Sequence, residues 1–168
     1  MSNSNYILNK KILTSDRDRF FNCVIDFVAI LIFIFIFTFL VVITGNILQV
    51  GVYSLWLKIM SSLGVLGTYF CFAVVYYLIF ENLFGRTVGK FLTGSIVVNE
   101  YGIKPNFTTV FTRTVCRLIP FDALSFLGES GRIWHDSISK TYVVEKNDLE
   151  KEMEIFYSLN FIGVNDEN

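Results

Sequence analysis

The sequence predicts an all-α integral membrane protein with two transmembrane helices, an interfacial or re-entrant third helix and a small cytoplasmic β-hairpin-like element. Two observations carry this prediction: two long segments almost without charges, and a third apolar segment interrupted by arginines. The composition agrees, because 53% of the 168 residues are hydrophobic and only 17% are charged. A typical soluble domain has about 25% charged residues. The length allows one small domain.

The first transmembrane helix is predicted at about residues 22–44. Residues 27–43 read FVAILIFIFIFTFLVVI, without a charge or a proline. A helix needs roughly 20 apolar residues to cross a bilayer core. Residues 1–19 are polar and form a cytoplasmic N-terminal segment, and the apolar run that follows is too long for a signal-peptide core. We therefore expect an uncleaved anchor.

The second transmembrane helix is predicted at about residues 61–84, where Glu81 is the only formal charge. The segment that connects the two spans, residues 45–59, is mixed in character and contains Tyr53 and Trp56. Amphipathic aromatic rings favour the boundary between water and lipid, so we expect this segment to rest on a membrane surface.

Basic residues flank the two spans unequally. Because positive residues remain on the cytoplasmic side, the first helix runs outward and the second returns. We expect a multi-pass protein of the plasma membrane with both termini in the cytoplasm. The basic residues before, between and after the spans are Lys10, Lys11, Arg17 and Arg19, then Lys58, then Arg86, Lys90 and Lys104.

Two β-branched segments follow the spans, at residues 96–98 and 141–145. We predict that they pair into a small cytoplasmic sheet, and two unrelated extended loops are the alternative. The acidic tail at residues 147–168 is expected to be a loosely held terminus or a short surface helix.

A third apolar stretch covers residues 107–127. Arg113 and Arg117 lie four positions apart, on one face of a helix. Each would cost about 2.5–3.5 kcal/mol at a bilayer centre, and Pro120 ends or kinks the helix. We therefore predict an interfacial or re-entrant helix at about residues 106–127, capped by Asn106. A kinked third span is the alternative.

Two carboxylates lie within the predicted spans. Asp26 is near the cytoplasmic start of the first helix, and its expected partner is Arg113 or Arg117. Glu81 points toward the membrane middle, because side chains tilt toward the amino end of a helix. It must be protonated, bonded to a neighbour such as Tyr77, or paired across the bundle. Such residues are candidates for an ion or proton site, or for a structural ion pair.

Four short motifs occur in order along the chain, and together they resemble the RDD family over about residues 19–144. Two positions depart from the family pattern: Asn22 stands at a small position, and Trp134 replaces leucine. Residues 19–26 (RFFNCVID) resemble RxxAxxID, residues 80–90 (FENLFGRTVGK) resemble ExxFGxTxGK, residues 113–120 (RTVCRLIP) resemble RxxxRxxP, and residues 134–136 (WHD) resemble LHD.

The resemblance implies a membrane domain at about residues 20–146, located in a bacterial inner membrane. The arginine and two aspartates for which the family is named fall on Arg19, Asp26 and Asp136. Family members are regarded as transporters, some of them linked to sodium–proton exchange. Others are similar to accessory partners in membrane complexes.

Several classes of function are excluded by what the sequence lacks. The net charge of −1 gives no basic field for nucleic acid. His135 is the only histidine, and no hydrolase, metalloprotease or P-loop motif accompanies it, so we expect no enzyme and no cofactor. Cys23, Cys71 and Cys116 lack CxxC spacing, and we expect buried reduced thiols rather than a metal site.

The leading functional prediction is a transporter-like protein coupled to ions or protons. Two or three helices cannot easily enclose a midplane site, so transport would require a homo-oligomer or another membrane protein as partner. The alternative is a non-transporting scaffold or accessory subunit of a membrane complex. The candidate site residues are Arg19, Asp26, Glu81, Arg113, Arg117 and Asp136.

Overall fold

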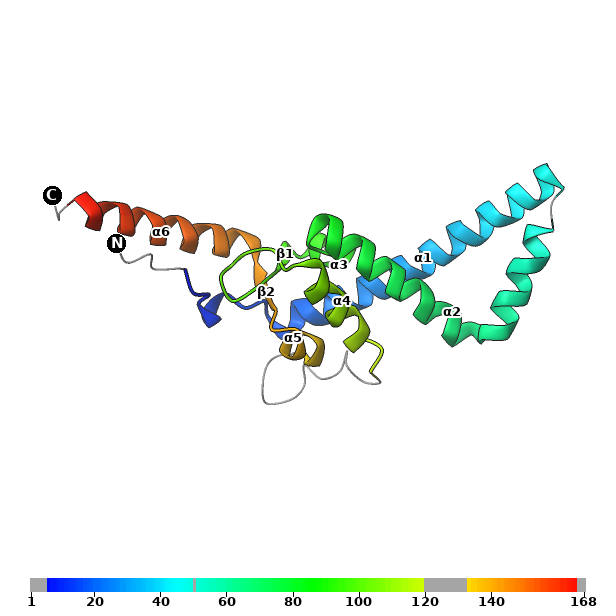
Figure 1. Cartoon of the computed structure of the whole chain (residues 1–168), viewed down its shortest axis with the longest axis horizontal. Coiled ribbons are helices and arrows are strands. Elements are labelled where there is room, and N and C mark those ends of the chain that lie inside the picture. The colour runs from blue at the N-terminus through cyan, green and yellow to red at the C-terminus, as the bar shows by residue number, and fades with distance from the viewer. Residues whose placement is uncertain (1–5, 50, 120–132, 166–168) are drawn as a thin grey trace.

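The computed structural model describes residues 6–49, 51–119 and 133–165. Two long helices lie side by side at one end of the molecule, and the shorter elements gather around their other end, where both chain termini also lie (Figure 1). In chain order the elements are η1 (Lys10–Ile12), α1 (Asp16–Leu48), α2 (Val52–Phe84), α3 (Val88–Leu92), β1 (Ser95–Val98), α4 (Phe107–Cys116), α5 (Trp134–Ile138), β2 (Tyr142–Glu145) and α6 (Lys146–Asn165).

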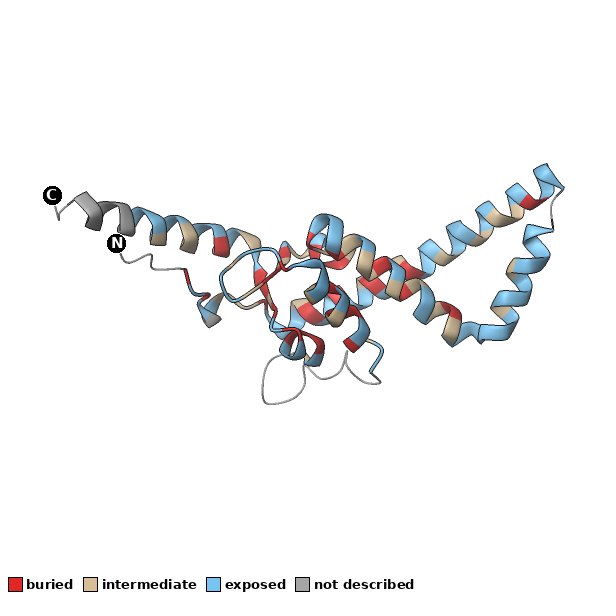
Figure 2. Ribbon diagram, viewed as in Figure 1, coloured by how far each residue is buried: buried red, intermediate tan, exposed pale blue. Residues whose placement is uncertain are grey.

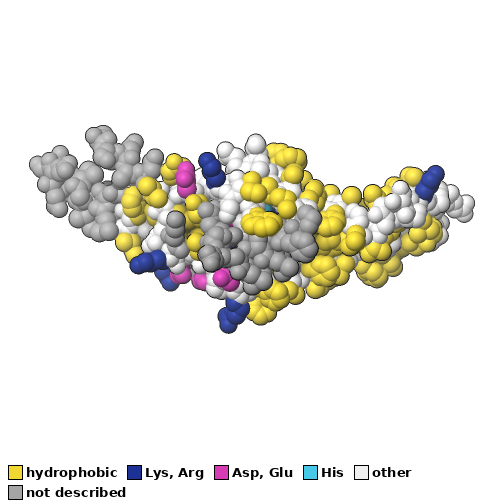
Figure 3. All heavy atoms as spheres, turned by 90° about the horizontal axis from the view of Figure 1, so that it is seen from below, with side chains coloured by type: hydrophobic (Ala, Val, Ile, Leu, Met, Phe, Trp, Pro, Cys, Tyr) yellow, Lys and Arg dark blue, Asp and Glu magenta, His cyan; other side chains and the backbone are white. Residues whose placement is uncertain are grey.

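Helices α1 and α2 confirm the two predicted apolar segments as helices. Each has 33 residues and is long and apolar enough to cross a membrane. Only 6% of the apolar window of α1 and 17% of that of α2 are buried within the chain, unlike the core helix of a soluble protein. Much of the α1–α2 half is exposed (Figure 2), and hydrophobic side chains dominate the face of it seen in Figure 3. An exposed apolar surface of this extent is typical of a site that contacts a membrane or another protein.

The connection between the two spans is more helical than the sequence predicts. Helix α1 continues to Leu48, and α2 begins at Val52, so most of residues 45–59 is helix. Helix α2 is bent at Gly64, whose φ of 67° is left-handed. The predicted span at residues 61–84 thus corresponds to the part of α2 around and after the bend. The Trp56 ring packs 5.1 Å from Phe37, which fastens the first part of α2 to α1.

The predicted strand pairing is confirmed. Strands β1 and β2 form a two-stranded antiparallel sheet in which Ile96 is opposite Val144. Val144 is fully buried and also forms a bridge to Leu13, which brings the chain before α1 onto the sheet. The tail then continues as α6, a 20-residue helix, which is longer than the short surface helix expected from the sequence. Its first turns are held to the sheet by the buried Leu149.

Helix α4 begins after Asn106 as predicted and ends at Cys116. Residues 117–119 of the predicted interfacial helix form a turn after α4, and its residues 120–127 lie outside the described residues. Helix α4 buries both polar and apolar side chains, and part of its apolar surface is exposed. Its exposed face carries Phe107, Phe111 and Val115, whereas Arg113 and Thr114 are buried.

The prediction of three buried thiols is wrong for two of them. Cys116 is buried, but Cys23 on α1 and Cys71 on α2 are exposed. The physical reason is that the apolar faces of α1 and α2 point outward, so an apolar sequence context does not imply burial inside this chain.

Candidate functional site

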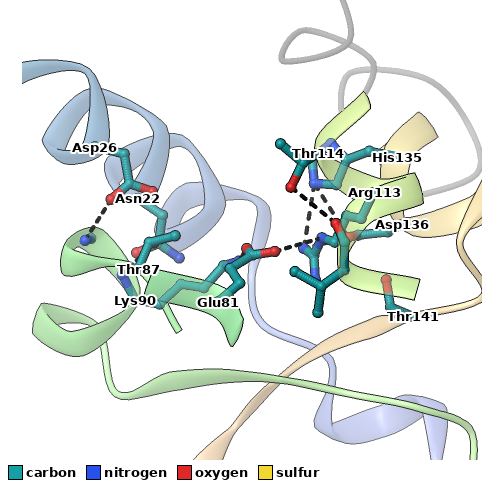
Figure 4. A network of polar contacts seen from close by, with 12 residues as sticks. Asn22, Asp26, Glu81, Thr87, Lys90, Arg113, Thr114, His135, Asp136 and Thr141 are labelled. Carbon is teal, nitrogen blue, oxygen red and sulfur yellow. Dashed lines mark hydrogen bonds and ion pairs between the residues drawn. The ribbon is translucent and has the colours of Figure 1, made fainter. Parts of the chain in front are cut away.

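Glu81 forms the centre of a buried ion cluster at the end of α2 (Figure 4). Its Oε1 lies 2.7 Å from Lys90 Nζ and 2.7 Å from Arg117 Nη2. Its Oε2 lies 3.7 Å from Arg113 Nε. The predicted option of pairing across the bundle is therefore the one observed. Because Lys90 belongs to α3 and Arg113 to α4, one carboxylate ties three helices together.

A second carboxylate, Asp136 of α5, extends this cluster. Its Oδ1 lies 2.5 Å from Arg113 Nη2 and 3.3 Å from His135 Nε2. Burial, and then the charges of Arg117 and Arg113, hold the pKa of His135 well below its usual range. His135 is therefore neutral at physiological pH and adds no charge to the cluster.

Asp26 does not join the arginines, so the predicted pairing with Arg113 or Arg117 is wrong. Its Oδ1 instead accepts hydrogen bonds from Tyr76 Oη and from the backbone amide of Gly89, each at 2.8 Å. The Tyr76 hydroxyl in turn accepts from the Val88 amide at 3.0 Å. The short helix α3, which the sequence reasoning did not foresee, supplies these amides beside α1.

The turn between α2 and α3 explains why Lys90 lies beside Glu81 and why the Gly89 amide lies beside Asp26. Gly85 ends α2 in the left-handed conformation, with φ of 71°. Thr87 then caps α3 by accepting from the Lys90 amide. A Cβ on Gly89 would lie 2.5 Å from the backbone oxygen of Asn22, so only glycine permits this approach of α3 to α1. Gly85 therefore ends α2, and Gly89 allows the close packing of α3 on α1.

Lys90 is the site residue that sequence reasoning missed, along with Tyr76 and His135. A signal was present, since Lys90 closes the ExxFGxTxGK-like segment that Glu81 opens. Burial, and then the charge of Arg113, lower the pKa of Lys90 to about 8. Its proton is therefore held far less tightly than that of an ordinary lysine.

A cavity of about 340 Å³ lies beside the cluster. One part of its wall is charged and the other is apolar. Arg19, predicted as a site residue, reaches this wall while its Nε donates to the Thr14 carbonyl at 3.1 Å. The lining of the cavity includes the polar residues Arg19, Asp26, Lys90, Arg113, Arg117 and His135, and the apolar or aromatic residues Phe27, Tyr69, Phe70, Val74, Tyr77 and Leu118.

The chemistry of the charged wall favours anions. Among the residues that the structure describes, four cations and one carboxylate, Asp26, line the cavity. Even when Glu81 and Asp136 are counted with them, cations outnumber carboxylates by four to three. Over the described ranges, no three His, Cys, Asp or Glu side chains are grouped as metal ligands. The residues present fit a negatively charged group better than a cation.

These features define a small membrane protein in which polar residues from five helices converge at one end of two long apolar helices. All four motifs of the sequence contribute to this end, through Arg19 and Asp26, Glu81 and Lys90, Arg113 and Arg117, and Asp136. The model of the RDD family matches residues 14–164, and the chain belongs to this family. No curated protein and no solved structure matches the chain.

Proposed function

We propose that this RDD protein is a non-transporting accessory or scaffold subunit of a membrane protein complex, placed in a bacterial inner membrane with both termini in the cytoplasm. The observation that carries the proposal is the environment of Glu81, whose carboxylate contacts Lys90, Arg113 and Arg117. Protonating Glu81 would leave three buried cations without this counter-charge, which is unfavourable. The carboxylate is suited to fixing helices, and not to exchanging a proton.

The arrangement of the chain supports this placement. Helix α6, near the carboxyl end of the chain, lies on the side of the ion cluster away from the α1–α2 connection (Figure 1). The exposed apolar stripe of α4 and its buried Arg113 suit a helix at the membrane interface, with its phenylalanines in lipid. Two long helices leave extensive apolar surface for lipid, a second copy of the chain or another membrane protein.

Ion- or proton-coupled transport is the second candidate, and one observation favours it. Lys90, with a pKa of about 8, lines the cavity together with Asp26. A lysine of this kind can exchange its proton near physiological pH. On this hypothesis the exchangeable proton is on Lys90, and Glu81 holds the cluster together.

Flux measurements distinguish the two candidates. The purified chain is reconstituted in proteoliposomes, and proton and sodium flux are followed under imposed gradients. The accessory role predicts flux no higher than in empty liposomes at any pH between 6 and 9. Flux that disappears in Lys90→Met, and persists in the control Lys104→Met, would instead establish transport. Lys104 is a suitable control because its Nζ donates to the Asn82 carbonyl, outside the cavity.

A further inference from the structure

We propose that the cavity of about 340 Å³ binds an anionic amphiphile, with a phosphate-bearing headgroup at its cationic wall and an acyl chain along its apolar wall. This inference does not depend on whether the chain acts as an accessory subunit or as a transporter. It follows from three observations on the cavity: unsatisfied donors, an excess of cations, and an apolar wall that reaches the lipid-facing surface.

The unsatisfied donors belong to Arg113, which lies in α4, and to Arg117, which directly follows α4. Arg113 Nη1 and Arg117 Nη1 are buried and have no hydrogen-bond partner within the described part of the chain. The Arg113 side chain is only 1% exposed. A buried donor without a partner is unfavourable, and more so when it is charged. The planar guanidinium matches a phosphate, whose oxygens can accept from several donors at once.

The charge balance indicates that the missing group is an anion. Lys90, Arg113 and Arg117 together face the two carboxylates of Glu81 and Asp136. Over the described part of the chain, one positive charge thus remains in this cluster, close to a cavity that Arg19 also lines. An incoming cation would meet this excess charge, whereas a phosphodiester would neutralise it.

The apolar wall shows why the ligand should carry a hydrocarbon chain. Phe27, Phe70 and Leu118 line the cavity and are 44–48% exposed, so the cavity is open at this wall. The wall therefore continues into the surface that α1 and α2 present to lipid. An acyl chain can lie on this wall and cover it, whereas a soluble phosphate would leave it uncovered.

The test compares lipid binding by the full chain and by paired variants. Protein in detergent is mixed with phosphatidylglycerol or phosphatidylcholine, and bound lipid is counted by native mass spectrometry. Val74→Phe fills the apolar wall without touching the cations, and Val75→Phe adds the same bulk at an exposed position outside the cavity. Arg117→Gln removes a cavity cation. Arg86→Gln removes a cation that stacks on Phe91 at 4.2 Å, outside the cavity.

We expect the wild-type chain to bind phosphatidylglycerol at least about tenfold more tightly than phosphatidylcholine, as charged hydrogen bonds imply. Val74→Phe and Arg117→Gln should each reduce this binding, whereas Val75→Phe and Arg86→Gln should retain it. Equal binding of the two lipids, or retention in Val74→Phe, would overturn the proposal. A separate arm uses glycerol 3-phosphate without lipid. If it raises the melting temperature as much as phosphatidylglycerol does, the cavity is a soluble-phosphate site, and the amphiphile proposal fails.

Discussion

The backbone amide of Gly89 donates to the Asp26 carboxylate over 2.8 Å and thereby joins the start of α3 to α1. Gly89 also lies against the backbone of Asn22, which is one helical turn before Asp26 on α1. Asp26 thus recognises the backbone of α3 and not a cation. The arginines of the α4 region remain available to Glu81 and Asp136.

Gly89→Ala should destabilise the protein. The added Cβ would lie 2.5 Å from the Asn22 oxygen, and backbone cannot yield as a flexible side chain can. Overpacking of this kind costs about 1–3 kcal/mol, so the melting temperature in detergent should fall. Gly51→Ala is the matched control, since its Cβ would make only an ordinary 3.4 Å contact with Ser54. Equal melting temperatures for the two variants would contradict the close packing of α3 on α1.

Asp26 should be coupled to Tyr76 and not to Arg117. Asp26→Asn removes the charge of the acceptor and Tyr76→Phe removes the donor of one buried hydrogen bond, so the double variant should lose less stability than the sum of the single variants. Asp26→Asn and Arg117→Gln should instead be additive within about 0.5 kcal/mol. Denaturant unfolding of the wild type, the three single variants and the two double variants would measure the free energy of unfolding for both double-mutant cycles. Additivity in the first cycle, or coupling in the second, would show that Asp26 has a different partner.

Glu81→Gln should reduce stability more than any exposed carboxylate change. Removing one partner of a buried ion pair strands the other and costs about 3–5 kcal/mol, and here three cations would be affected. Glu100→Gln, at a solvent-exposed turn, should stay within about 0.5 kcal/mol of the wild type. The fraction that remains monodisperse after heating in detergent reports the difference. A wild-type profile for Glu81→Gln would mean that the cluster does not hold the helices.

Lys90 should make stability depend on pH in the alkaline range. Its folded pKa is about 8 and its ordinary value is 10.5, so between these values the unfolded chain binds more protons than the folded chain. Stability should therefore rise as pH increases through this window, by up to roughly 3 kcal/mol from this group. The penalty for the buried charge is fully present below pH 8. Melting curves of wild type and Lys90→Met from pH 7 to 10 would measure the increment. Parallel pH profiles of the two proteins would contradict it.

The topology can be checked with tags and a thiol label. Tags at residues 1 and 168 should both be protected in intact cells, and a cysteine introduced at Gly51 should react with an impermeant reagent from outside. This expectation rests on the positive charges that flank the spans and on the α1–α2 connection, which lies opposite both termini (Figure 1). Cleavage of the carboxyl-terminal tag by an external protease would require a further crossing after α2.

The sequence by itself determined the features that depend on short segments of chain. The two apolar runs specify α1 and α2, because about 20 apolar residues are needed to cross a bilayer and soluble domains rarely contain them. The β-branched residues predicted the pairing of β1 with β2. The four motifs also identified the family correctly.

Only the tertiary structure decided which charged groups meet. The sequence predicted that Asp26 pairs with an arginine such as Arg117, but Asp26 accepts a hydrogen bond from the Gly89 amide of α3. Glu81 instead pairs with Lys90, which follows it after the turn between α2 and α3. The exposure of Cys23 and Cys71 likewise depends on which faces of α1 and α2 pack against the rest of the chain and which point outward. The physical reason is that hydropathy and turn propensity act within a few residues. The partner of a buried charge depends on how helices far apart in the chain pack together in space.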